Sequence, residues 1–83
     1  MNYPIVIFLN NDNTYRVLIP DFDDLSFNCE DLDHAFSKAD ANIVKQIRAL
    51  NSAGKELPIA TERENYITRY LDAVLVSQVS ITL

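Results

Sequence analysis

The 83-residue chain has a single glycine, a single cysteine and a single histidine. Because Gly54 is its only glycine, the sequence contains no glycine-rich phosphate-binding loop. One cysteine and one histidine cannot supply the spaced ligands of a zinc site, and Cys29 has no internal partner for a disulfide. We therefore predict no cofactor and no metal. A lone cysteine also fits the reducing cytoplasm, which is the expected location.

Basic residues are scarce as well, with 7 lysines and arginines against 12 acidic residues and a formal net charge of −5. Clustered lysine and arginine supply most of the affinity for phosphate backbones, so this balance argues against direct DNA binding. No apolar run reaches the roughly 20 residues of a membrane span, and no basic segment typical of a signal peptide opens the chain. The composition, 48% apolar, predicts one small globular domain over residues 1–83.

Three strands are predicted in the first third of the chain. Residues 3–9 are apolar on both alternating faces, which is typical of a strand covered on both sides, or covered on one side and paired with a partner on the other. The polar residues 10–13 predict a turn into a second strand at residues 14–19, and therefore a hairpin. Residues 25–29 alternate between apolar and polar side chains. They predict a third strand with one solvent-exposed face, in which Cys29 is a small buried residue.

A long helix is expected to begin after Asp31, a good N-cap, and to end at Gly54, which can adopt a left-handed conformation. Its apolar residues recur at helical spacing over about 20 residues. They are Leu32, Phe36, Ala39, Ile43, Ile47 and Leu50.

The last third of the chain predicts a short helix and a final strand. Thr61 and Glu64 resemble a capping box for a helix over residues 62–71. Residues 73–83 form an alternating strand that must pair, and we expect it beside the first hairpin. The predicted fold is thus α+β: a three-stranded antiparallel meander, a long helix on one sheet face, a short second helix and a C-terminal strand.

Between Arg16 and Lys38 the chain has acidic residues and no basic ones. The candidate partner-binding residues are Asp21, Asp23, Asp24, Glu30, Asp31 and Asp33. They form either a solvated face that keeps a small protein soluble or a surface that attracts a basic partner. Clustered carboxylates can also bind Mg²⁺ or Ca²⁺, but this set lacks the alternating spacing and the glycine of a calcium loop.

We predict no catalytic residues. His34 lies in the first turn of the long helix, beside acidic residues and away from the apolar stripe. This position favours a solvent-exposed histidine over a member of a catalytic triad. A small hydrolase that uses the acidic loop around Asp21 and Asp24 is the remaining enzymatic alternative.

The order of several short motifs resembles the N-terminal domain of HicB-like antitoxins. That family has an apolar first strand, a tyrosine-led second strand followed by Pro-Asp, a third strand, and an acidic helix start of the Leu-x-x-Ala type. Later it has a Gly-x-x-(Ile/Leu)-Pro motif and a last strand. The matching positions here, which span almost the whole chain, are Tyr3-Pro4, Tyr15, Pro20-Asp21, Leu32-Asp33-His34-Ala35, Gly54-Lys55-Glu56-Leu57-Pro58 and residues 73–83.

The sequence departs from the family pattern in two ways. Many members have Pro-Gly-Cys after Pro-Asp-Leu, whereas this chain has Asp23-Asp24-Leu25, which implies a loop with a different shape and more charge. Many members also continue into a helix-turn-helix or ribbon-helix-helix DNA-binding domain. Residues 1–83 match only the N-terminal part, so the operator binding of the family is not expected from them.

The resemblance implies a partial RNase H-like fold and a non-enzymatic antitoxin. Members of the family bind small basic HicA-type toxins, which cleave RNA, and cover the surface and the catalytic histidine of the toxin. The alternative is an orphan HicB-like protein without a toxin, which self-associates through the edges of its sheet. The two hypotheses are compatible because toxin-binding members commonly self-associate, and a homo-oligomer, a dimer or larger, is expected in either case.

Overall fold

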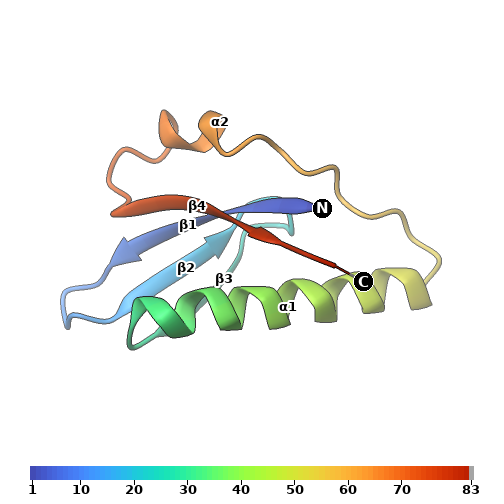
Figure 1. Ribbon diagram of the computed structural model, residues 1–83, viewed down its shortest axis with the longest axis horizontal. Helices are drawn as coiled ribbons and strands as arrows, with labels where there is room; N and C mark the ends of the chain where they lie inside the picture. Colours follow the sequence, from blue (N-terminus) through green and yellow to red (C-terminus); the bar gives the residue numbers. More distant parts are fainter. Residues whose placement is uncertain (83) are drawn as a thin grey trace.

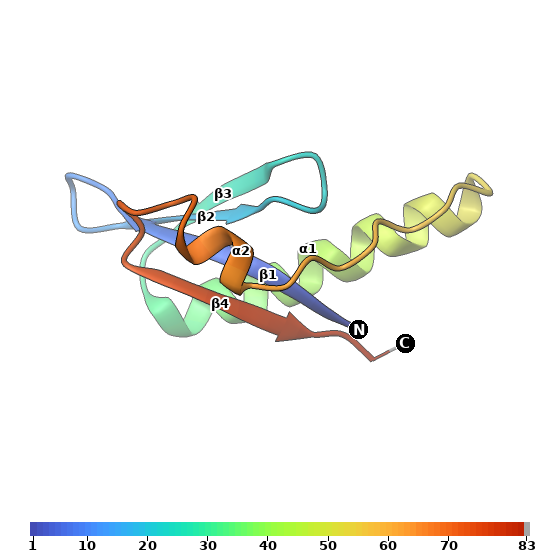
Figure 2. The ribbon, with the colours of Figure 1, turned by 90° about the horizontal axis from the view of Figure 1, so that it is seen from above.

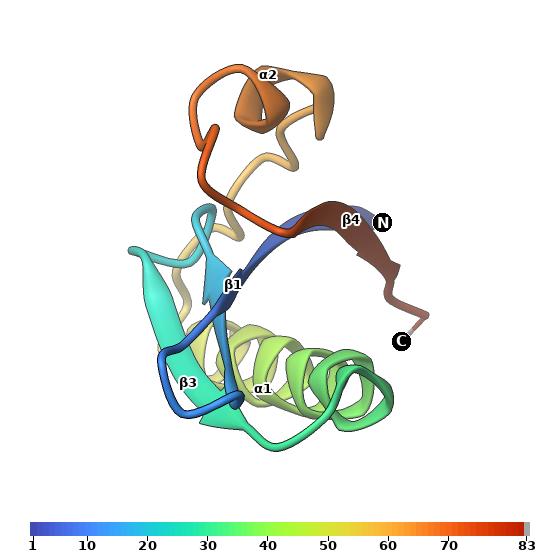
Figure 3. The ribbon, with the colours of Figure 1, turned by 90° about the vertical axis from the view of Figure 1, so that its left-hand side faces the viewer.

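The computed structural model describes residues 1–82 and shows a curved antiparallel sheet with helices on its two opposite faces (Figures 1 and 3). The elements are β1 (Asn2–Leu9), β2 (Tyr15–Ile19), β3 (Leu25–Cys29), α1 (Leu32–Ser52), α2 (Glu64–Ile67) and β4 (Leu75–Ser80). The strand order is β3-β2-β1-β4, and each neighbouring pair is antiparallel. The predicted α+β fold is confirmed, including the position of the last strand beside the first hairpin.

The central strand β1 is buried on both of its faces, because every residue from Tyr3 to Phe8 is buried. Alternate side chains of a strand point to opposite sides of the sheet. Tyr3, Ile5 and Ile7 join the main core under α1, and Val6 and Phe8 join a smaller cluster under α2. Of the two interpretations of this apolar run, coverage on both sides is therefore correct.

Both ends of α1 follow the predicted signals. The Asp31 side chain accepts a hydrogen bond of 2.9 Å from the backbone N–H of His34, which makes Asp31 the N-cap. At the other end Gly54 has a φ of 69°. The backbone N–H of Gly54 donates to the Asn51 carbonyl at 3.1 Å, and that of Lys55 to the Leu50 carbonyl at 2.9 Å. This pair of bonds satisfies two of the last carbonyls of the helix.

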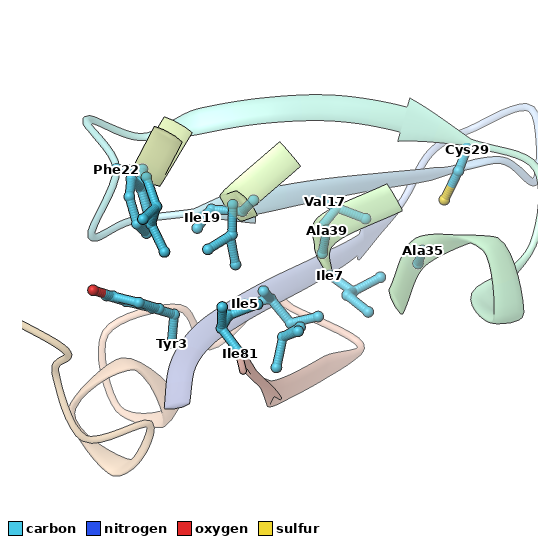
Figure 4. Close-up of a cluster of buried hydrophobic side chains, with 13 residues drawn as sticks. Tyr3, Ile5, Ile7, Val17, Ile19, Phe22, Cys29, Ala35, Ala39 and Ile81 are labelled. Atoms are coloured by element: carbon cyan, nitrogen blue, oxygen red, sulfur yellow. The ribbon is translucent and has the colours of Figure 1, made fainter. Parts of the chain in front are cut away.

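The face that α1 buries is narrower than the apolar stripe predicted. The fully buried residues are Ala35, Ala39, Ile43 and Ile47. Ala35 and Ala39 join the same cluster as Ile7 of the sheet (Figure 4), and such small side chains allow a close approach of helix and sheet. The prediction that Leu32 belongs to the core is wrong: it is 38% exposed, because it is the first residue of α1 and the sequence places no helical turn before it.

The last third of the chain differs most from expectation. The predicted helix over residues 62–71 is reduced to the single turn of α2, whose N-cap is Arg63 with no side-chain cap. The predicted capping box of Thr61 is therefore wrong, because Thr61 binds Asp21 instead. β4 is shorter than residues 73–83, and its predicted end at Leu83 lies outside the described residues.

A connector of residues 55–63 joins the two layers. It leaves the end of α1 and reaches α2 on the opposite face of the sheet (Figures 1 and 2). The hydroxyl of Tyr3 donates to the Pro58 carbonyl at 2.8 Å and ties the connector to the start of β1. In the part of the chain from residue 1 to 82, no helix is both long enough and apolar enough to cross a membrane.

We predict that Ile43→Ala lowers the free energy of unfolding by about 2–5 kcal/mol, because Ile43 is fully buried and its truncation leaves a cavity. The matched control is Ile59→Ala. Ile59 is 91% exposed, so the same change there is expected to stay within about 0.5 kcal/mol. Urea denaturation measures the free energy of unfolding of both variants, and an equal decrease in the two would contradict the packing described.

Candidate partner-binding surface

The six acidic residues form two groups, one at each end of the edge strand β3. Asp21, Asp23 and Asp24 precede the strand, and the other three follow it. A strand of five residues spans about 16 Å at roughly 3.3 Å per residue. The structure therefore does not bring the predicted residues together into a single patch.

Asp21 faces the interior of the molecule. One of its carboxylate oxygens accepts hydrogen bonds from the Thr61 hydroxyl at 2.8 Å and the Tyr66 hydroxyl at 2.9 Å. The other accepts the backbone N–H of Thr61 at 2.8 Å. Burial and the neighbouring Asp21 carboxylate raise the pKa of Tyr66, so this hydroxyl stays protonated as a donor. Asp21 thus joins the β2–β3 loop to the connector and to α2.

Asp23 and Asp24 are exposed at the tip of the same loop. Both have a left-handed backbone, with φ values of 55° and 56°, which aspartate tolerates better than most residues. Phe22 anchors the loop beside them, because its ring is buried edge-to-face against Tyr3 at a centroid distance of 4.8 Å. The buried anchor leaves the next two carboxylates in solvent.

At the other end of β3, Asp31 is engaged within its own helix. Besides capping α1, its carboxylate lies 2.9 Å from Nδ1 of His34. The hydrogen bond from the His34 backbone N–H, followed by the one from the His34 ring, holds the pKa of Asp31 below its ordinary value. Glu30 and Asp33 are exposed. The prediction that His34 is exposed is confirmed, since 68% of its side chain is accessible.

A hollow beside Asp21 and Asp23 combines acidic and apolar side chains. We call it the acidic hollow; it contains no basic residue and is lined by Asp21, Phe22, Asp23, Gln46, Leu50, Glu56, Leu57, Pro58 and Ile59. The sequence does not mark Glu56 and Ile59 as surface candidates, because they lie in an irregular connector with no periodicity. A large apolar residue as exposed as Ile59 is the signal that the structure adds.

A second, more open hollow lies at the other end of β3, between the hairpin turn and the start of α1. Its lining includes the acidic residues Asp12 and Glu30 and the basic residues Arg16 and Lys38, together with His34. Its remaining lining residues are Asn10, Asn11, Thr14, Asn28 and Cys29. The basic neighbours offset the acidic residues at this end, so the acidic hollow is the stronger candidate for a basic partner.

The possible metal ligands and the single thiol are also placed by the structure. Among residues 1–82, no group of three or more His, Cys, Asp or Glu side chains is placed to hold a metal ion. Cys29 is buried, as predicted, and burial raises the pKa of its thiol. A thiol with a raised pKa is a poor nucleophile at neutral pH.

We predict that Asp21→Asn lowers the free energy of unfolding by about 1–3 kcal/mol, because the amide keeps only one oxygen for three donors. Asp24→Asn is the matched control, since asparagine also accepts a left-handed backbone, and it is expected to stay within about 0.5 kcal/mol. Urea denaturation distinguishes them. Equal stability of the two variants would show that Asp21 does not hold the layers together.

A second prediction concerns how the stability of the chain depends on pH. Because the pKa of Asp31 is lowered in the folded chain, its contribution to stability is present above the ordinary aspartate pKa of about 4 and is lost as pH falls through the folded value. Asp31→Asn keeps a good N-cap but cannot ionise. The melting temperature of the parent chain should exceed that of the variant at pH 7, and the gap should close in acid. A constant gap would contradict this role.

Comparison with known proteins places the fold. No protein-family model matches the sequence, and no curated protein matches it. A crystal structure of the N-terminal domain of Burkholderia pseudomallei antitoxin HicB is similar with a TM-score of 0.84 at 22% identity, over 100% of both chains. A chain of the HicA3 and HicB3 toxin-antitoxin complex is similar with a TM-score of 0.79 at 25% identity, again over 100% of both chains. The protein therefore has the fold of the HicB antitoxin N-terminal domain, as its sequence motifs implied.

Proposed function

We propose that this chain is a non-enzymatic antitoxin that binds and inhibits a small basic ribonuclease toxin of the HicA type. The observation that carries the proposal is the structural similarity over the whole chain to a HicB antitoxin domain. The similar chain from a HicA3 and HicB3 complex supports a HicA-type partner in particular. Fold alone does not determine function, so the surface must also suit such a partner.

The acidic hollow has the anatomy of a site for a basic protein. Protein interfaces combine an apolar centre with a polar rim. Here Ile59 and Leu57 supply exposed or half-exposed apolar surface, and Asp23 and Glu56 supply negative charge beside it. With a net charge of −5, the whole chain also attracts a basic partner at long range.

Inhibition would follow from competition for the same charges on the toxin. A ribonuclease binds the RNA backbone through lysine and arginine. Carboxylates such as Asp23 and Asp24 offer these cations an alternative partner, and the apolar surface around Ile59 excludes water from the contact. The chain would then occlude the RNA-binding surface without any chemistry of its own.

The direct test is an RNA-cleavage assay with the protein that is encoded beside this chain, which the proposal expects to be small and basic. Purified chain is titrated against a fixed amount of that protein, and co-purification of the two is followed in parallel. The proposal expects a stable complex and stoichiometric loss of cleavage. A neighbouring protein that is not small and basic, or cleavage that persists in excess chain, would refute it and leave the orphan HicB-like protein as the remaining hypothesis.

We predict that Asp23→Asn combined with Asp24→Asn slows association with the toxin by about tenfold at low salt, because these exposed carboxylates steer the encounter. The control replaces two other exposed acids, Asp40→Asn and Asp72→Asn, and removes the same net charge. Surface plasmon resonance over a series of salt concentrations measures both. An equal slowing in the control would mean that net charge acts without a local site.

Ile59→Ala should instead accelerate dissociation, since it removes apolar contact.

A further inference from the structure

We propose that residues 56–73, which we call the outer segment, open from the rest of the fold as one unit, and that Asp21 is the latch that keeps them closed. The outer segment contains most of the connector, α2 and the turn after α2 (Figure 2). It also forms one side of the acidic hollow, so its opening removes the surface proposed for the toxin. The effect on the toxin rests on the proposed function, whereas the opening is a property of the chain alone.

The backbone of the outer segment has no hydrogen bond to the backbone of the sheet or of α1. Within the described residues 1–82, residues 56–61 form no backbone–backbone hydrogen bond. Every such bond of residues 62–73 is internal to the segment. Bonding to β1 resumes only at Val74, whose N–H donates to the Ile7 carbonyl at 2.8 Å. The outer segment can therefore leave without breaking the sheet or α1.

Side chains attach the outer segment to the rest of the chain at two places. Asp21 accepts three hydrogen bonds from it, two from Thr61 at 2.8 Å and one from Tyr66 at 2.9 Å. A fourth bond, of 2.8 Å, runs from the Tyr3 hydroxyl to the Pro58 carbonyl. In the part of the chain that the structure describes, no further hydrogen bond and no ion pair makes this connection. Asp21 thus supplies most of the polar attachment.

The apolar contacts of the outer segment are few. Tyr66 is the only buried side chain of the described residues 56–73. The other contacts with the core clusters come from half-buried residues, namely Leu57, Ala60, Tyr70 and Ala73. Ile59 and Leu71 are 91% and 84% exposed. Few buried apolar contacts, together with a backbone that is not bonded to its neighbours, mark a region that opens at a lower free energy than the core.

The acidic hollow lies across the boundary between the outer segment and the rest of the fold. Residues 56–59 line one side of it, and the β2–β3 loop and α1 line the other. A ligand that contacts both sides binds only the closed form, so binding and opening exclude each other. Asp21 belongs to both structures, since it lines the hollow and bonds to Tyr66 of α2. Occupation of the hollow therefore stabilises α2, although no residue of Glu64–Ile67 lines it.

Amide hydrogen exchange of the chain without toxin tests the latch. In the parent chain, the hydrogen-bonded amides of residues 62–73 should exchange faster than the most protected amides of α1. Asp21→Asn leaves one side-chain oxygen for three donors, so exchange in residues 62–73 should become about tenfold faster. Asp24→Asn in the same loop is the matched control and should leave that exchange unchanged.

Ala39→Gly separates the opening of the segment from unfolding of the whole chain. Glycine inside a helix is destabilising, so the amides of α1 should exchange about fivefold faster, while residues 62–73 should not change. Tyr66→Phe keeps the buried ring and removes one bond to Asp21, which guards against misfolding of the Asp21 variant; it should speed exchange in residues 62–73 about threefold. Equal acceleration of both regions by Ala39→Gly, or no acceleration by the folded Asp21 and Tyr66 variants, would overturn the proposal.

The link to the hollow is tested by adding the HicA-type toxin and following the amides of residues 64–73, which do not line the hollow. Binding to the closed form alone should slow their exchange about a hundredfold when free toxin is about a hundred times its Kd. A toxin that binds and protects only the hollow would refute the link. A protein that does not bind at all would refute the proposed function and the link with it, while the exchange measured without toxin decides the latch.

Discussion

The fold depends on the burial of β1 between two layers. A strand with apolar residues on both faces needs a cover on each, so the chain must pass from one side of the sheet to the other. The connector of residues 55–63 makes this passage after α1. Tyr3 holds the connector at Pro58, and Asp21 holds the connector at Thr61 and α2 at Tyr66. These few polar bonds keep the second layer in place over Val6 and Phe8.

The same constraint divides the acidic residues by role. Asp21 joins the two layers through its hydrogen bonds, and Asp31 caps the start of α1. Asp23 and Asp24 stay in solvent because Phe22 anchors their loop. The two sheet edges consequently differ: charge surrounds β3, and β4 carries none.

Local signals in the sequence predicted the fold, and long-range contacts limited what could be predicted of the surface. The hairpin and both ends of α1 follow from turn and capping residues within a few positions of one another. Thr61 was misassigned because its partner, Asp21, lies 40 residues away. The acidic segment was identified, but its division into two groups needs the length of β3 in space. Glu56 and Ile59 carry no periodic signal and appear only when the connector is folded against Asp21 and Phe22.

Amide hydrogen exchange of the chain, with and without the HicA-type toxin, tests the account most directly. Two segments report separately: the loop and connector around Asp23 and Ile59, and the edge strand β4. We expect toxin to slow amide exchange in the loop and connector and to leave the exchange of β4 unchanged. Protection of β4 by the toxin, with no change around Asp23 and Ile59, would contradict the assignment of the acidic hollow as the toxin-binding surface.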